Sequence, residues 1–167
     1  MFRKLDDFLG AWDNNRQGTS KVLANLTDAS LSQAINADHR TIGRIAWHIV
    51  QTLPEMGNQT GLEILGPDPK TAVPKTAAEI KKAYDVAAQS LRDEVTSKWD
   101  DATLAKVDNL YGENWARGLT LRLLMEHEIH HRGQLMVLMR QAGLAVPGVF
   151  GPSKEEWAQH GAPAPEI

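Results

Sequence analysis

Residues 125–135 have the sequence MEHEIHHRGQL and lie in a segment, about residues 114–141, whose apolar residues recur with helical period. His127 and His131 are four residues apart, so they project from the same face of this helix. Neutral imidazoles at that spacing can bind one divalent metal ion together. The run therefore predicts a long helix and also the chemistry that this helix could carry.

Three further segments have the same helical period, and strand signals are almost missing. These segments span about residues 3–26, 41–60 and 76–99. Thr76 and Glu79 form a capping-box pattern that predicts the start of the third segment. Pro54 is expected to bend or end the second helix, because its ring collides with the carbonyl of Val50. The pattern predicts an all-α protein.

The connections between these helices are about 12–16 residues long, whereas simple up-and-down bundles use short turns. We therefore predict a four-helix bundle with at least one long crossover connection. Gly143 is a natural residue to end the last long helix. A short C-terminal helix is expected to start at Ser153, to be capped by Glu156 and to end at Gly161.

Length and composition favour a single domain over residues 1–167, with about 162–167 as a loose tail. The net charge of -3 implies no broad basic surface, so nucleic acid is not an expected partner. The absence of cysteine excludes disulfides, thiolate ligands and a cysteine nucleophile. No apolar run approaches the roughly 18–20 residues of a membrane span, and the N-terminus is charged. We therefore expect a cytoplasmic protein that does not bind a membrane.

A third metal ligand is expected from the second helix, because two imidazoles alone bind a metal weakly. On a helical wheel, Leu124 and Leu138 share the sector of His127 and His131, so both rings should point into the bundle. His48 lies on the inward stripe of the second helix. Bundle cores build metal sites from facing helices, and we therefore predict that His48, His127 and His131 bind the metal, with His130 at the flank.

Other interpretations of these residues are weaker. A single inward histidine is more often a hydrogen-bonded core residue than a metal ligand. His127, Glu128 and His131 match the zinc-protease pattern H-E-x-x-H, but no third ligand follows at the required place. Glu128 and His131 also match the Glu-x-x-His motif of di-iron bundles, which needs a second copy that the chain lacks. Arg44 and Arg132 could hold an anionic substrate group.

Three neutral imidazole ligands leave the full charge of a divalent ion uncompensated. A water bound at an open position would ionise near neutral pH, and a coordinating thiol would lose its proton. The predicted ligand set therefore suits the formation of a hydroxide or a thiolate.

The chain resembles the DinB/YfiT-like superfamily. The resemblance rests on HHRGQL (130–135) with His127 before it, on IGRIAWH (42–48) and on VPGVFGPS (146–153), and it extends to about residue 156. It implies a four-helix bundle with crossed-over topology that is often a homodimer. It also implies a divalent metal, typically zinc or nickel, bound by His48, His127 and His131.

The resemblance further implies a class of reaction. Characterised members are S-transferases and isomerases that use bacillithiol, mycothiol or glutathione. Mycothiol-type members tend to carry an additional domain, so a bacillithiol-type transferase fits this short chain better. We predict a metal-dependent enzyme in which a low-molecular-weight thiol attacks a small electrophilic molecule, with no separate catalytic side chain identified. A hydrolase that uses a metal-bound hydroxide and a non-catalytic metal-binding stress protein stay open as alternatives.

Overall fold

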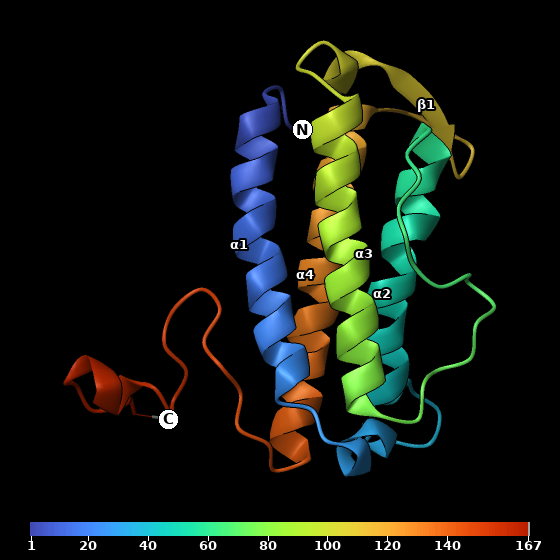
Figure 1. The fold of residues 1–167 in the computed structure, drawn as a ribbon. Helices are drawn as coiled ribbons and strands as arrows, with labels where there is room; N and C mark the ends of the chain where they lie inside the picture. Colours follow the sequence, from blue (N-terminus) through green and yellow to red (C-terminus); the bar gives the residue numbers. More distant parts are fainter. Residues whose placement is uncertain (167) are drawn as a thin grey trace.

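The computed structural model describes residues 1–166 and contains four long helices packed side by side (Figure 1). They are α1 (Leu5–Ala24), α2 (Ile42–Gly57), α3 (Ala77–Lys98) and α4 (Arg117–Gln141). The predicted four-helix bundle is confirmed, with helix ends that differ from the predicted ones by up to three residues. The last residue of the predicted tail, 167, lies outside the described residues.

The connection between α2 and α3 is the predicted crossover. α2 and α3 start at the same end of the bundle, so residues 61–76 return along its length (Figure 1). α1 and α2 each pack against both α3 and α4. The indole nitrogen of Trp47 donates a hydrogen bond to the carbonyl of Thr71 at 3.0 Å and so fastens the crossover to α2. Two short 3-10 helices flank α2, η1 (Asp28–Ser32) and η2 (Asn58–Thr60).

The helix ends follow local sequence signals. Thr76 and Glu79 form the predicted capping box at the start of α3, and Thr41 caps α2 by accepting a hydrogen bond from the amide of Arg44. The helix passes through Pro54 and ends only at Gly57, so Pro54 does not end α2. The amide of Asn58 donates to the carbonyl of Pro54 and closes this last turn.

A β-hairpin corrects the expectation of a chain with almost no strands. β1 (Val107–Leu110) pairs antiparallel with β2 (Glu113–Ala116), after the 3-10 helix η3 (Thr103–Ala105). The two-residue turn has positive φ at both Tyr111 (54°) and Gly112 (84°), which matches the twist of paired strands. Strands of four residues are too short to show alternation in the sequence. Because 113–116 pair with β1, α4 begins at Arg117 rather than near residue 114.

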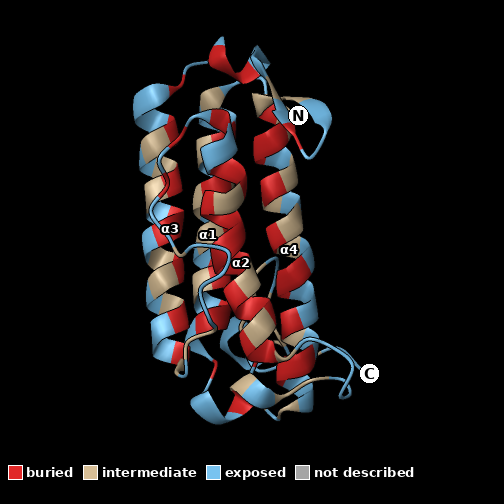
Figure 2. Ribbon diagram, turned by 90° about the vertical axis from the view of Figure 1, so that its right-hand side faces the viewer, coloured by how far each residue is buried: buried red, intermediate tan, exposed pale blue. Residues whose placement is uncertain are grey.

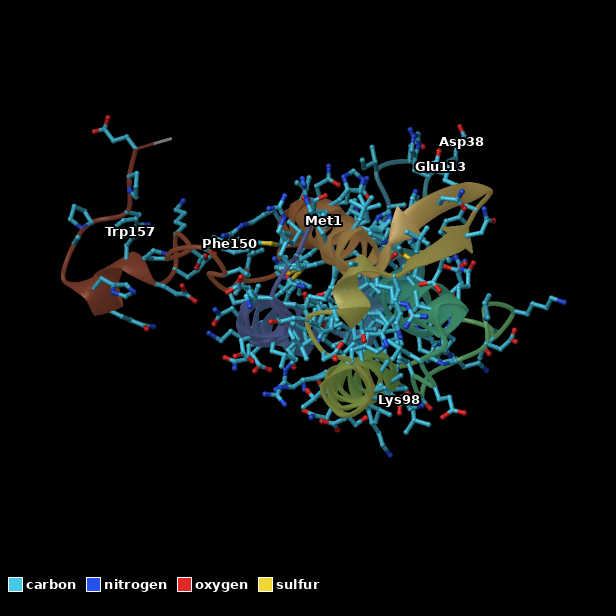
Figure 3. The ribbon with its side chains drawn as sticks, turned by 90° about the horizontal axis from the view of Figure 1, so that it is seen from above. Met1, Asp38, Lys98, Glu113, Phe150 and Trp157 are labelled. Atoms are coloured by element: carbon cyan, nitrogen blue, oxygen red, sulfur yellow. The ribbon has the colours of Figure 1, made fainter. Side chains whose placement is uncertain are left out.

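The C-terminal segment leaves the bundle after Gly143, whose φ of 73° confirms it as the residue that ends α4. Val149 packs closely on Gly18 of α1, where no larger side chain would fit without displacing it. The predicted helix from Ser153 is reduced to one 3-10 turn, η4 (Trp157–His160), which projects away from the bundle (Figures 1 and 3). Glu156 accepts hydrogen bonds from the amides of Gly148 and Ser153 and holds the preceding loop.

Buried residues line the inner faces of the four helices (Figure 2). Most are apolar, but the core also holds a polar network around Glu128 of α4, which is 2% exposed. Its Oε1 accepts hydrogen bonds from Asn15 Nδ2 and Thr19 Oγ1, both at 2.7 Å, and from the hydroxyl of Tyr84 at 2.8 Å. Burial raises the pKa of the Glu128 carboxyl, although these hydrogen bonds and Arg132 act in the opposite direction. The network ties α4 to α1 and α3.

Arg132 extends the same network one turn further along α4. Its Nη1 donates to the carbonyl oxygen of Asn15 at 3.0 Å and to Thr19 Oγ1 at 2.8 Å, and the residue is 2% exposed. Glu128 and Arg132 therefore fix the face of α4 that points at α1. The residues that precede each of them, His127 and His131, are turned by about 100° and face α2 instead.

Replacing Glu128 by Ala should lower the free energy of unfolding by about 3 kcal/mol or more. Three buried donors would lose their acceptor, and the buried Arg132 would lose the nearby negative charge. Urea unfolding followed by circular dichroism measures this loss. Glu126→Ala, on the exposed side of the same helix turn, should change stability by no more than about 0.5 kcal/mol. Equal losses in the two variants would show that the network does not hold α4.

Candidate metal centre

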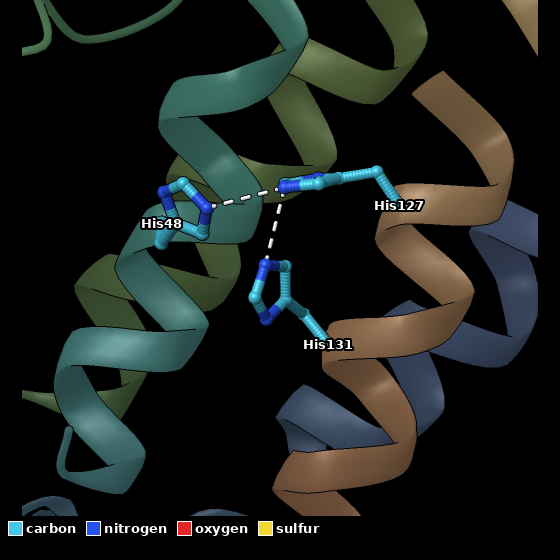
Figure 4. A group of neighbouring side chains, drawn as sticks. All are labelled: His48, His127 and His131. Carbon is cyan, nitrogen blue, oxygen red and sulfur yellow. Dashed lines mark hydrogen bonds between the residues drawn. The ribbon is translucent and has the colours of Figure 1, made fainter. Parts of the chain in front are cut away.

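Three imidazoles from two neighbouring helices converge at one point (Figure 4). The Nε2 atoms of His48 on α2 and His127 on α4 lie 3.3 Å apart, and those of His127 and His131 lie 3.1 Å apart. The three potential ligand atoms all lie within 4.8 Å of one another. The structure thus brings together the three histidines that the sequence singled out, and their role as metal ligands stays a prediction.

The spacing of these nitrogens fits a metal ion. In a tetrahedral zinc site with Zn–N bonds of about 2.0–2.1 Å, two ligand nitrogens lie about 3.3 Å apart. The observed separations of 3.3 and 3.1 Å are close to that value. Little movement of either helix would be needed for the three rings to coordinate one ion.

Hydrogen bonds among the rings satisfy this cluster less well than a cation would. His131 Nδ1 donates to Gln134 Oε1 at 2.8 Å, so the Nε2 of His131 carries a lone pair. His127 Nε2 could then either donate its proton to His131 or accept one from His48, so it cannot satisfy both contacts at once. A cation accepts the lone pairs of all three rings at once, and the donor set therefore favours metal binding.

The rings are electrically suited to the role of neutral ligands. Burial, followed by the effect of neighbouring histidines, lowers the pKa of His48 to about 4 and that of His127 to about 4. Burial also lowers the pKa of His131, against the effect of its hydrogen bond with Gln134. Arg40 contributes to the lowering at all three rings. Imidazoles with such pKa values are unprotonated at neutral pH and can bind metal without first losing a proton.

Gln134 is a supporting residue that the sequence reasoning missed. Its carbonyl oxygen holds the His131 ring, and its amide nitrogen lies 3.1 Å from Nε2 of the exposed His130. Fixing the second ring nitrogen of a ligand histidine sets its orientation and tautomer. The available signal was the spacing of three residues between His131 and Gln134, which places them side by side on one helix face. His130 lies outside the trio, as predicted.

Glu128 and Arg132 do not join the centre. Both are buried on the side of α4 that faces α1, so Glu128 cannot act as the base of an H-E-x-x-H site. Arg132 likewise donates its hydrogen bonds to α1 within the core and is not directed at a substrate group near the histidines. Arg44 donates to Gln51 Oε1 at 3.1 Å along its own helix. The weaker interpretations of Glu128 and Arg132 therefore do not fit this geometry, because helix rotation directs these side chains away from the histidines.

The fold and the cluster define a class: a crossed-over four-helix bundle with a candidate three-histidine metal centre between α2 and α4. The family model of the DinB family matches residues 1–165, and the chain belongs to this family. Among the residues that the structure describes, no helix is both long enough and apolar enough to cross a membrane.

Individual relatives agree with this assignment. The chain is 42% identical to YrdA of Bacillus subtilis (strain 168), described as an uncharacterized protein, over the full length of both chains. It is similar to a crystal structure of a DinB-like protein from Bacillus cereus ATCC 10987, with a TM-score of 0.87 and 39% identity, over 90% of this chain and 100% of that one. A second DinB-like protein, YjoA from Bacillus subtilis, has a TM-score of 0.67 and 18% identity over 86% of this chain and 96% of that one, and it supports the fold alone.

Replacing Gln134 by Leu should weaken zinc binding by about tenfold, because His131 would lose the acceptor that fixes its ring. Competition with a chromophoric chelator measures the affinity. Gln141→Leu, at the exposed end of the same helix, is the matched control and should bind zinc like the unchanged protein. Equal affinities of the two variants would show that Gln134 does not support the centre.

Proposed function

We propose that this protein is a divalent-metal-dependent transferase that activates a low-molecular-weight thiol toward small electrophilic molecules. The observation that carries the proposal is the donor set: three neutral imidazoles, with no carboxylate among the described members of the cluster. Bound zinc or nickel would lower the pKa of a thiol that reached it, since the ligands leave its positive charge undiminished. Membership of the DinB family supports the same class of reaction through the resemblance described above.

The residues of the chain would contribute position and environment. His48 and the pair on α4 present three lone pairs from opposite sides, and Gln134 holds the His131 ring in place. Apolar neighbours such as Ile45 and Leu124 are buried on the adjoining turns and limit the access of water. His48 and His127 are only half-buried, so the centre stays open to small molecules on one side.

Within residues 1–166, no carboxylate belongs to the histidine cluster that could act as a general base. Glu128, which follows His127 in the sequence, is hydrogen-bonded in the core on the other side of the helix, and Glu126, which precedes it, is exposed and accepts a hydrogen bond from Arg122. The proton of the thiol would therefore leave to solvent through the open side. In the transfer itself, a sulfur–carbon bond would form while the bond to the leaving group of the electrophile breaks. This assigns thiol activation to the metal centre rather than to a catalytic acid–base pair.

Zinc- or nickel-loaded protein should conjugate a thiol such as bacillithiol or glutathione to 1-chloro-2,4-dinitrobenzene, with release of chloride. His127→Ala should lose both bound metal and activity, by about a hundredfold or more, because two imidazoles do not retain the ion. Elemental analysis and the absorbance of the conjugate measure the two effects. His160→Ala, an exposed histidine in η4, is the control and should retain both.

Two outcomes would contradict this proposal in different ways. Full metal stoichiometry in His127→Ala would show that the ligand assignment is wrong. Hydrolysis of model esters by the metal-loaded protein without any thiol, and no thiol conjugation, would favour the hydrolase alternative.

A further inference from the structure

A hollow of about 520 Å³ lies next to the histidine cluster, on the outer side of His131. It is formed by α4, the first turn of α2 and the loop that precedes α2. Of the three candidate ligands, His131 lines the hollow together with Gln134, so a molecule in the hollow would lie beside that histidine. The size suits a small organic molecule rather than a macromolecule.

One wall of the hollow is apolar. Ile35 of the loop is 63% exposed and Val137 of α4 is 57% exposed, and both line the hollow, so they offer apolar surface to a molecule inside it. The buried Ile45 and Leu138 continue the same wall toward the core. Such a surface favours a ligand with an apolar body.

The polar side of the hollow carries an unpaired positive charge. Arg40 is exposed, and within residues 1–166 its guanidinium forms no ion pair and no hydrogen bond. It lines the same hollow as His131. Asp38 also lines the hollow and forms no ion pair with Arg40. Arg40 is therefore available to an external anion.

The charge of the candidate metal centre with a bound ion also favours an anionic ligand. The three imidazoles are neutral, and the cluster contains no carboxylate among the described residues. The charges of Asp38 and Arg40 offset each other in the lining of the hollow, so a bound divalent ion would give the hollow and the centre together a net positive charge. Two neighbouring centres of positive charge repel each other, and an anion between or beside them relieves the repulsion. The hollow is thus better suited to anionic than to neutral molecules.

We infer that this hollow is a substrate subsite that selects small molecules with an apolar body and a carboxylate group, and that Arg40 is its specificity-determining residue. The apolar body lies along Ile35 and Val137, and the carboxylate pairs with Arg40. The reactive end of the molecule then faces His131. This assignment rests on the proposed function for its link to catalysis, but binding in the hollow can be tested by itself.

The test uses two probes of nearly equal shape, 4-phenylbutyrate and its neutral amide, 4-phenylbutyramide. Titration followed by two-dimensional NMR of the protein gives their affinities. Arg40→Gln should weaken binding of the carboxylate about fivefold and that of the amide less than twofold. Arg3→Gln, before the start of α1, is the matched control and should change neither. Val137→Ser should weaken both probes alike, because it removes apolar surface that each of them contacts.

The titrations are carried out on zinc-loaded and on metal-free protein. An Arg40-dependent preference for the carboxylate in both forms supports the inference. A preference that appears only with zinc and survives Arg40→Gln would show that the metal holds the carboxylate, and it would overturn the role of Arg40. Equal loss of both probes in Arg40→Gln would also overturn it. Failure of the proposed function would appear elsewhere, as metal retention in His127→Ala, and would leave the NMR result unaffected.

Discussion

The rotation of α4 about its own axis is the constraint on which the candidate centre depends. Glu128 accepts three hydrogen bonds from α1 and α3, and Arg132 donates to Asn15 and Thr19 of α1. Turning the helix would break these buried hydrogen bonds at a large cost in free energy, so they favour the observed orientation. That orientation turns the histidines at 127 and 131 toward α2. A core interaction thus sets the geometry of a site on the opposite face of the same helix.

The two faces of α4 therefore differ in function, although their residues are neighbours in the sequence. One face carries Glu128 and Arg132, whose Oε1 and Nη1 atoms are hydrogen-bonded within the core, while Oε2 and Nη2 are buried without a partner among the described residues. The other presents neutral imidazoles whose Nε2 atoms point at a shared position with His48. Because no acid from the first face reaches the second, the centre would keep the full charge of a bound divalent ion. This separation explains why a motif that contains glutamate can form a site without a carboxylate.

The sequence predicted those features that depend on spacing within one helix. Two patterns predicted that His48, His127 and His131 lie together: the interval between His127 and His131, and the inward stripe around His48. The capping box at Thr76 predicted the start of α3. Features that depend on distant partners could not be predicted. The environment of Glu128 depends on Asn15, which is 113 residues away in the sequence. The hairpin was not predicted because its strands are too short to show a pattern. The position of Arg40 in the hollow could not be predicted either, because it depends on the fold, which places the loop of Arg40 beside α4.

The central claim is that imidazoles from two helices bind one metal ion, and X-ray absorption at the zinc edge tests it most directly. Spectra of the zinc-loaded protein should show three imidazole ligands with Zn–N distances of about 2.0–2.1 Å. The His48→Ala variant should lose most of its bound zinc and the imidazole signal with it, because the remaining pair from α4 does not retain the ion. An unchanged imidazole signal in that variant would contradict the account, because the site would then not span α2 and α4. A zinc environment made of carboxylate and water oxygens alone would contradict it as well.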